Sequence, residues 1–307
     1  MSDLRVVLGP VEGNEVRLAL GAVDGVDLVA TSDLDEASGA LAEAEVFVTY
    51  QWRPDLLTER LRWVQSISVG VDHFPLDELA DAGIVLTSAR GIHGPQVAEH
   101  VFGMLLAMTR GIAVSVRDQL ERRWRWPRVT ELGGRTMGIL GLGVIGEAVA
   151  TRARAFGMRV IGTKRRPEEY AGVAKEVYGP EDTLAVFEAS DVVVITLPGG
   201  PETTGIVGEA ELAALRGGWL VNVGRGTVVD EASLVAAVED GVLAGAALDV
   251  FSEEPLPKDS PLWALDSVLV TPHVAGVSPH YGERLAEVFA VNLAAHRGEG
   301  PWVNRVV

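Results

Sequence analysis

The sequence of 307 residues contains no cysteine. Disulfide bonds, thiolate nucleophiles and metal sites built on cysteine are therefore excluded. Long apolar runs are also missing, since the longest, from Val101 to Met108, is far too short to span a bilayer. The first residues, MSDLRVVLGP, lack a basic segment followed by an apolar one, so no export signal is expected. We therefore expect a cytoplasmic protein with no membrane partner.

Positive charge is scarce as well. The chain holds 26 lysine and arginine residues against 43 aspartate and glutamate residues, which gives a net charge of −17. Such a surface repels phosphate backbones, so a nucleic-acid partner is not expected. The stretch from Arg122 to Arg128 mixes tryptophan and arginine as a nucleic-acid patch does. Given the charge of the whole chain, we expect Trp124 and Trp126 to pack against a partner lobe or subunit instead.

What the chain does have is a regular alternation of apolar, β-branched runs with amphipathic stretches. Strands are expected at residues 4–8, 26–30, 46–50, 64–68, 84–87, 136–141, 159–163, 191–196, 219–223, 246–250 and 268–271, and helices at 95–110, 144–156, 209–215, 230–239 and 282–297. Continuous hydrophobic strands that are each followed by a helix indicate parallel sheets covered on both faces. The fold class is therefore predicted to be α/β.

The length favours about two domains at ~150 residues each. The long apolar helix at 95–110 has the character of a connection between two lobes, and the C-terminal helix is placed to return to the first lobe. We expect a flavodoxin-like, substrate-binding lobe made of residues 1–98 and 278–307. A dinucleotide-binding Rossmann lobe, residues 99–277, is expected to be inserted in it.

The stretch GILGLGVIGEAVA follows an apolar strand and opens a helix. Within it, Gly141, Gly143 and Gly146 spell G-x-G-x-x-G, which serves a tight turn, close backbone approach to a pyrophosphate and close helix–strand packing. The helix N-terminus adds free N–H groups and a positive dipole. This pattern in this context predicts a dinucleotide site.

Three cations, Lys164, Arg165 and Arg166, follow the next strand. An NAD-binding protein is expected to carry an acid near this point, about 20 residues after the glycines, to bind the adenosine ribose. A carboxylate repels a 2′-phosphate, whereas a guanidinium grips it. The cluster favours NADP(H), with NAD(H) as the alternative. The other interpretation is a solvated basic loop, or an ion pair with Glu168 or Glu169.

Three later segments each place a reactive side chain just past a strand. Arg225 lies in LVNVGRGTVVD, Asp249 and Glu254 lie in ALDVFSEEPLP, and His273 lies in VLVTPHVAG. In a parallel sheet, ligands bind outside the carboxyl ends of the strands. An arginine, a carboxylate and a histidine there suit reduction of a carbonyl beside a carboxylate, because arginine orients the acid and histidine supplies the proton.

With these motifs the chain resembles the D-isomer-specific 2-hydroxyacid dehydrogenases along essentially its whole length. The resemblance rests on GLGVIG, NVGRG, DVFSEEPLP and TPHVAG in family order, with SVGVD and RGIHGPQVAEH before them. It implies two lobes hinged around a cleft, and a homodimer formed mainly through the nucleotide-binding lobes. The basic residues at 164–166 are similar to those of glyoxylate/hydroxypyruvate reductases, which act on small 2-oxo acids.

The resemblance also implies residue roles. Arg225 would bind the substrate carboxylate and keto oxygen, Glu254 would pair with the histidine, and His273 would be the acid/base. The amides of Val69 and Gly70 would hold the substrate carboxylate, and Asp249 would approach the nicotinamide carboxamide. The cofactor would contact Gly141, Gly143, Val144, Ile145, Gly146, Lys164, Arg165, Arg166, Leu197, Pro198, Thr203, Val223, Gly224, Arg225, Asp249, His273, Ala275 and Gly276.

Two alternatives to an NADPH-preferring 2-oxo-acid reductase remain open. One is an NAD-linked D-2-hydroxyacid dehydrogenase with another substrate. The other is a cofactor-sensing, corepressor-like binding protein, which retained catalytic residues do not exclude. Gly199 and Gly200 stand where the family usually has a bulkier pair, and no prediction is drawn from them.

The remaining histidines and aromatic residues carry weaker indications. His93 is expected to make a structural hydrogen bond, with substrate contact as the alternative, and His100 to be a satisfied core histidine. The residues from Tyr50 to Trp52 follow a strand and are candidates for lining the substrate pocket. No metal site is predicted, because Asp72 and His73, adjacent on an extended segment, point to opposite faces.

Overall fold

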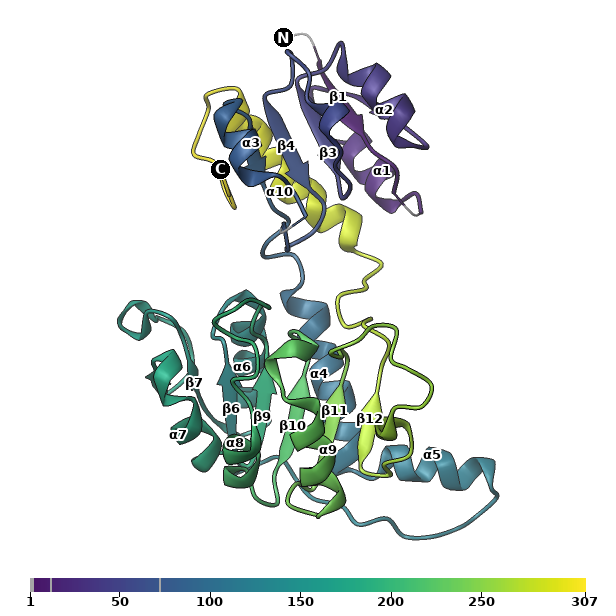
Figure 1. The fold of residues 1–307 in the computed structure, drawn as a ribbon, viewed down its shortest axis with the longest axis vertical. Coiled ribbons are helices and arrows are strands. Elements are labelled where there is room, and N and C mark those ends of the chain that lie inside the picture. The colour runs from purple at the N-terminus through teal and green to yellow at the C-terminus, as the bar shows by residue number, and fades with distance from the viewer. Residues whose placement is uncertain (1–2, 12, 72) are drawn as a thin grey trace. The chain divides into compact units, whose positions relative to one another are not determined.

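The computed structural model describes residues 3–11, 13–71 and 73–307 (Figure 1). They divide into two compact units, and the chain passes between them twice. The first unit comprises Met1–Ile92 and Val277–Val307, and the second comprises His93–Gly276. The second unit is thus inserted in the first. The chain changes unit just before the helix at 94–109, whereas the sequence placed the boundary at residue 98, inside that helix.

The first unit is built on a five-stranded sheet in which every neighbouring pair is parallel. The strand order is β2-β1-β3-β4-β5, the flavodoxin-like order of doubly wound sheets. Its strands are β1 (Leu4–Leu8), β2 (Val26–Ala30), β3 (Val46–Thr49), β4 (Trp63–Ser66) and β5 (Val85–Thr87). The sequence predicted all five within two residues at each end.

Helices cover both faces of this sheet. They are α1 (Glu15–Gly21), α2 (Leu34–Leu41), α3 (Leu76–Asp81) and α10 (Tyr281–His296), with a short 3₁₀ turn, η1 (Pro54–Leu56). The C-terminal α10 lies beside α1, and its Leu285 and Phe289 are fully buried against the sheet. Phe289 stacks on Trp63 of β4 with ring centroids 4.9 Å apart. The last helix of the chain therefore completes the core of the first unit.

The second unit is built on a seven-stranded parallel sheet in the order β12-β11-β10-β9-β6-β7-β8. Its strands are β6 (Thr136–Leu140), β7 (Arg159–Thr163), β8 (Glu176–Tyr178), β9 (Val192–Ile195), β10 (Trp219–Asn222), β11 (Gly245–Leu248) and β12 (Val268–Val270). The sequence did not predict β8, because its three residues at the sheet edge include a glutamate and form no apolar run. The two parallel sheets confirm the predicted α/β class.

Helices again cover both faces. They are α4 (Gly94–Thr109), α5 (Ile112–Leu120), α6 (Val144–Ala155), α7 (Thr183–Glu188), α8 (Glu209–Ala214) and α9 (Glu231–Glu239), with 3₁₀ turns η2 (Pro167–Glu169), η3 (Pro180–Asp182), η4 (Gly226–Val228) and η5 (Pro261–Trp263). Within the described ranges no single helix is long and apolar enough to cross a membrane. The pair α4 and α5 meets that test only when taken together, and it is bent by 67°.

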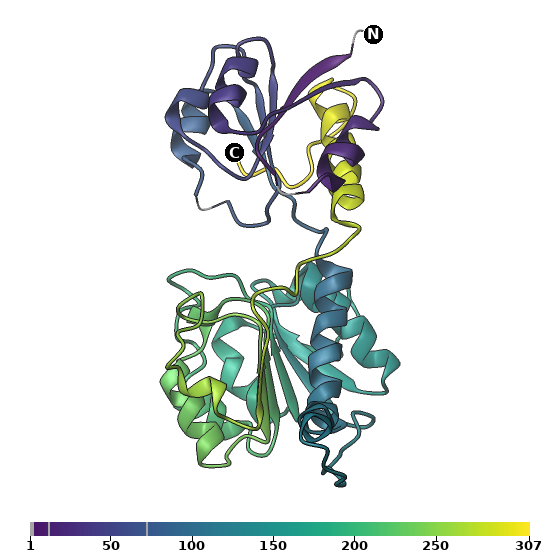
Figure 2. The ribbon, with the colours of Figure 1, turned by 90° about the vertical axis from the view of Figure 1, so that its right-hand side faces the viewer.

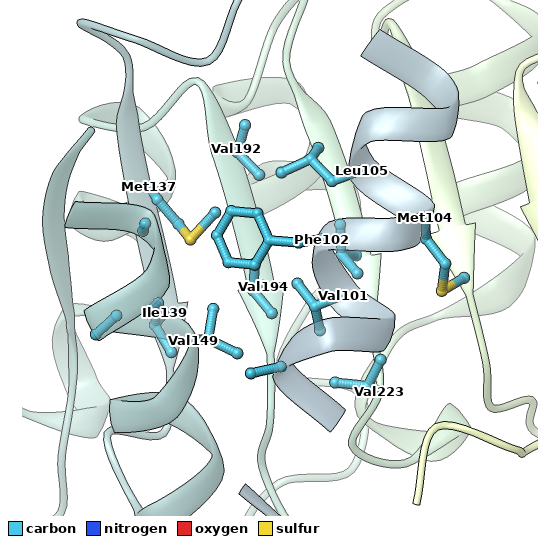
Figure 3. Close-up of a cluster of buried hydrophobic side chains, with 14 of the residues drawn as sticks. Val101, Phe102, Met104, Leu105, Met137, Ile139, Val149, Val192, Val194 and Val223 are labelled. Carbon is cyan, nitrogen blue, oxygen red and sulfur yellow. The ribbon is translucent and has the colours of Figure 1, made fainter. Parts of the chain in front are cut away.

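The core of the second unit explains why α4 belongs to it. Figure 2 shows α4 running along one face of the sheet, and Figure 3 shows Val101, Phe102 and Leu105 of this helix among side chains from β6, α6 and β9. The opposite face packs against α7, α8 and α9. All four residues of β9 are fully buried, as expected for a strand covered on both faces.

The order of the strands also locates a crevice. From β6 the chain proceeds to β7 and β8 on one side and then returns to β9 on the other side. In doubly wound sheets, the loops diverge at such a switch point and leave room for a ligand at the carboxyl ends of the strands.

Candidate active site

The side chains predicted to act in the second unit all follow strands of one parallel sheet. The glycine loop follows β6, Leu197 follows β9, Arg225 follows β10, Glu254 follows β11 and His273 follows β12. Because the strands are parallel, their carboxyl ends meet at a single edge. The structure therefore brings these segments to one edge of the second unit.

The glycine loop has the geometry of a phosphate cradle. Gly141 has a φ of +97°, a backbone conformation that residues other than glycine rarely adopt. A Cβ on Gly146 would lie 2.3 Å from the carbonyl oxygen of Gly141, so this position is closed by the main chain. A Cβ on Gly143 would meet no atom within 4 Å, and Gly143 is the N-cap of α6. The loop thus fits a pyrophosphate at a helix N-terminus.

Threonine side chains fix this loop to its neighbours. The Thr196 hydroxyl, just past β9, donates to the Gly141 carbonyl oxygen at 2.7 Å. The Gly141 amide donates to the Thr163 hydroxyl at 3.2 Å. The segment that follows Thr196 is fixed by a hydrogen bond of its own, from the Thr203 hydroxyl to the Pro198 carbonyl oxygen at 2.8 Å. The Leu197 main chain lies close to Gly224. A Cβ on Gly224 would come within 2.5 Å of the Leu197 carbonyl oxygen.

Arg225 combines an anchored main chain with an exposed side chain. The Asn222 side chain donates to the Arg225 carbonyl oxygen at 3.0 Å and accepts from the Gly224 amide at 3.1 Å. Gly226 packs against the main chain of Phe251, where a Cβ would come within 1.8 Å. The guanidinium donates only to the Gly224 carbonyl oxygen, at 2.7 Å, among the described residues. Most of its donors are therefore available for an acid.

Glu254 and His273 form a hydrogen-bonded pair. His273 Nδ1 lies 2.7 Å from Glu254 Oε2, and Glu254 Oε1 accepts from the Phe251 amide at 3.0 Å. Because a carboxylate only accepts, Nδ1 carries the proton of this bond. Nε2 makes no hydrogen bond to any described residue, and the His273 side chain is 50% exposed. The pair thus leaves one ring nitrogen available for proton transfer.

The loop that carries His273 is held by Asp249, which is 1% exposed. Its Oδ1 accepts from the Thr271 hydroxyl at 2.6 Å and the Val274 amide at 3.0 Å, and its Oδ2 accepts from the Ala275 amide at 2.9 Å. Burial alone would raise the pKa of the Asp249 carboxyl, but hydrogen bonds from His100, Thr271 and the two amides outweigh burial and hold the pKa below its usual value. Asp249 is therefore an ionised anchor of the His273 loop.

Other predicted cofactor residues line the same edge. Val144 and Ile145 begin α6, Val223 and Ala275 are buried in the core beside α4, and a Cβ on Gly276 would contact the His93 ring. The contact predicted between Asp249 and the nicotinamide carboxamide stays a prediction, since both carboxylate oxygens already accept hydrogen bonds from the chain.

The three cations differ in their surroundings. Lys164 Nζ donates to the Leu142 carbonyl oxygen at 3.0 Å, within the glycine loop. Arg166 pairs with Glu169 at 2.7 Å, the ion pair that the sequence left open. Arg165 is exposed and makes no hydrogen bond or ion pair to a described residue. Lys164 and Arg165 thus remain the candidates for contact with an anion.

Val69 and Gly70 belong to the first unit, in the loop after β4, where the Ser68 hydroxyl donates to the Gly70 carbonyl oxygen. Near them, His73 Nε2 lies 2.6 Å from the Tyr50 carbonyl oxygen. Asp72, the other member of the rejected metal pair, lies outside the described residues. His93, the N-cap of α4, has its Nδ1 3.2 Å from Nε2 of the Gln96 side chain.

Sequence reasoning missed the polar residues that hold these loops: Thr196, Asn222 and Thr271. Their signal was a hydroxyl or amide side chain at the end of an apolar strand, where a backbone group needs a partner. His100 Nε2 lies 2.9 Å from the Thr271 hydroxyl and 3.4 Å from Asp249 Oδ1, and so supports Asp249 both directly and through Thr271. The partly buried His100 has partners, as its position on an apolar helix indicated.

Comparison with known proteins agrees with this geometry. The family model for the D-isomer specific 2-hydroxyacid dehydrogenase, NAD binding domain, matches residues 102–275. The chain belongs to this family. It is an oxidoreductase that uses a nicotinamide cofactor, and the dehydrogenase reduces 2-oxo acids. The resemblance predicted from its motifs is therefore confirmed.

Several relatives of this dehydrogenase have named activities. A glyoxylate reductase of Korarchaeum cryptofilum is 39% identical over 79% of this chain and 75% of the relative. A glyoxylate/hydroxypyruvate reductase B of Yersinia pestis is 33% identical over 88% of this chain and 86% of the relative. The solved NADPH-dependent glyoxylate/hydroxypyruvate reductase of Sinorhizobium meliloti is 29% identical, with a TM-score of 0.82, over 99% of this chain and 98% of that one.

The glycine loop yields a matched pair of substitutions. Gly143→Ala adds a methyl group to open space, so we expect an unchanged melting temperature and cofactor binding at least tenfold weaker, because the methyl occupies the place of a phosphate. Gly146→Ala adds the same group 2.3 Å from a carbonyl oxygen, so we expect it to destabilise the fold by about 1–3 kcal/mol. Thermal unfolding and cofactor titration measure both. Equal melting temperatures for the two variants would contradict the conclusion that Gly143 faces open space and Gly146 is closed by the main chain.

Proposed function

We propose that this dehydrogenase reduces glyoxylate, hydroxypyruvate or a similarly small 2-oxo acid to the D-2-hydroxy acid, with a preference for NADPH. The observation that carries the proposal is the Glu254–His273 pair, which lies at the same sheet edge as Arg225 and leaves one imidazole nitrogen available. The names of the relatives support the choice of small 2-oxo acids.

Arg225 is proposed to bind the substrate. Its anchored main chain directs an exposed guanidinium whose planar donors match a carboxylate and the adjacent keto oxygen. The same contact would polarise the carbonyl toward attack at C2. The amides of Val69 and Gly70 are proposed, from the family resemblance, to hold the substrate carboxylate as well.

His273 is proposed to protonate the substrate oxygen. Nδ1 is committed to Glu254, which fixes the ring orientation and the tautomer, so the proton is delivered from Nε2. The bound nicotinamide supplies the hydride. In the reverse direction, Nε2 would accept the proton of the hydroxy acid. The role of Glu254 is therefore to hold the imidazole in one orientation through both directions.

The catalytic roles predict a large loss of rate. His273→Ala removes the proton donor, so we expect kcat to fall by about 10²–10⁴ with the fold intact. His280→Ala is the control, since His280 is an exposed histidine paired with Glu283 in the first unit. Initial rates with glyoxylate, hydroxypyruvate, phenylpyruvate and 2-oxoisocaproate measure both variants.

Near-normal turnover by His273→Ala would refute the proposed role of this histidine. If the wild-type protein oxidises neither NADPH nor NADH with any acid of the panel, the proposed small 2-oxo acid substrates are wrong.

The preference for NADPH rests on Lys164 and Arg165. Lys164 already lies against the glycine loop, and Arg165 is exposed beside it without a partner among the described residues. An NAD-selective site has a carboxylate near this point to bind the ribose hydroxyls. Two cations there favour a 2′-phosphate through charge-assisted hydrogen bonds.

Substitution of these cations tests the preference. For Lys164→Ala and Arg165→Ala we expect the KM for NADPH to rise about tenfold, while the KM for NADH changes little, because a hydrogen bond to a charged group contributes about 1.5–3 kcal/mol. Arg159→Ala is the control, since Arg159 begins β7, the strand that precedes the cations, and pairs with Glu176. Equal KM values for NADPH in the cation variants and the wild type would contradict the proposal.

We also propose a homodimer that buries α5 and the segment that follows it. Leu120, Trp124 and Trp126 are 81%, 96% and 91% exposed, which is unusual for such large apolar side chains. Asp118, buried on α5, accepts from Arg125 Nε at 2.5 Å. Arg125, between the two tryptophans in sequence, is thus held toward α5, whereas Trp124 and Trp126 remain almost fully exposed. A second copy of the chain is the proposed partner of these tryptophans.

The dimer proposal is tested by light scattering coupled to gel filtration. We expect the wild-type protein to elute at twice the 32.6 kDa of the chain, and the double variant Trp124→Ala, Trp126→Ala at 32.6 kDa. Trp263→Ala, which changes an exposed tryptophan elsewhere on the second unit, should leave the mass unchanged. A dimeric double variant would place the interface elsewhere.

A further inference from the structure

The segment that follows the three cations is tied to the start of α6 by one carboxylate. Glu147, in the first turn of α6, directs Oε2 to the Tyr170 hydroxyl at 2.5 Å and Oε1 to the Val173 amide at 2.9 Å. The Tyr170 hydroxyl in turn accepts from the Ala174 amide at 2.9 Å. Tyr170 is thus the junction between α6 and the segment from the cations to β8.

The hydroxyl of Tyr170 is a stable donor at neutral pH. Burial, together with the hydrogen bond to Glu147, raises the pKa of Tyr170 to about 12. The hydroxyl therefore stays protonated. It donates a hydrogen bond to the Glu147 carboxylate and accepts one from the Ala174 amide. Both partners, Glu147 and Ala174, thus hold the Tyr170 hydroxyl oxygen in place.

Tyr170 also faces Lys164. The Lys164 ammonium lies 6.0 Å from the centroid of the Tyr170 ring, at the limit of a cation–π contact, and donates to the Leu142 carbonyl oxygen at 3.0 Å. No described carboxylate lies within ion-pair distance of Lys164. Glu147, a few residues from Leu142, instead binds the Tyr170 hydroxyl and the Val173 amide. The ammonium is therefore held between the glycine loop and an aromatic ring, with its charge not neutralised by a partner.

We propose that Glu147 and Tyr170 are positioning residues for recognition of the 2′-phosphate of NADPH. They fasten the cation segment to the helix whose N-terminus faces the pyrophosphate, and so hold Lys164 beside the glycine loop at the place of the adenosine ribose. This inference rests on the proposed preference for NADPH. It adds that the selectivity depends on an uncharged phenol and an acid, and not on the cations alone.

The test uses Tyr170→Phe, which keeps the ring beside Lys164 and removes the hydroxyl junction. Calorimetric titration with adenosine 2′,5′-bisphosphate and with adenosine 5′-monophosphate isolates the contribution of the 2′-phosphate. We expect the bisphosphate to bind about fivefold more weakly to the variant, the effect of one lost hydrogen bond, and the monophosphate to bind as before. Tyr178→Phe is the matched control, because it removes a tyrosine–glutamate hydrogen bond, to Glu176 at 2.8 Å, on the nearby strand β8.

Glu147→Gln provides a second variant, with the same expected direction, and decides the question should Tyr170→Phe not fold. If both variants bind the bisphosphate as the wild type does, or if both probes weaken equally, the positioning role is refuted and the NADPH preference stands. If the wild-type protein binds the two probes equally, the proposed preference itself is wrong, and the positioning role falls with it.

Discussion

The geometry of the second unit depends on the parallel direction of its seven strands. Since all the strands point the same way, their carboxyl ends share one edge, and residues as distant in sequence as Gly141 and His273 come to lie along it. The order of the strands then opens a crevice between the loops that follow the adjacent strands β6 and β9. Burial of β9 on both faces keeps this arrangement rigid, because helices on either side leave its backbone no room to shift.

Around this edge the backbone is fixed by short polar side chains and by glycines, which have no side chain. Thr196 and Asp249 each bind main-chain groups of a neighbouring loop, and Asn222 binds those of its own loop. Gly224 and Gly226, by contrast, allow two main chains to touch. Arg225 and His273 lie on the loops that these contacts hold, and the guanidinium and the imidazole remain exposed. The reactive groups are thus held through their backbones, which leaves their polar atoms available to a substrate.

The sequence predicted most strands within two residues, because buried parallel strands are continuous apolar runs. It also predicted the pairing of Glu254 with His273, through the family motifs. It could not predict β8, whose edge position requires no apolar pattern, or the burial of Asp249 beneath the His273 loop. Nor could it separate Arg166, paired with Glu169, from Arg165, since three adjacent cations look alike until the backbone direction of each is known.

The backbone of His273 has a φ of +52°, a left-handed conformation in which a side chain bearing a Cβ is strained by about 1–2 kcal/mol. Glycine would relieve that strain, but it would also delete the imidazole. Selection for stability alone would therefore replace this residue, whereas selection for turnover retains it. In this loop, a change that raises the free energy of unfolding would lower the activity. Hydrogen bonds from the Val274 and Ala275 amides to the buried Asp249 hold the loop in the strained conformation.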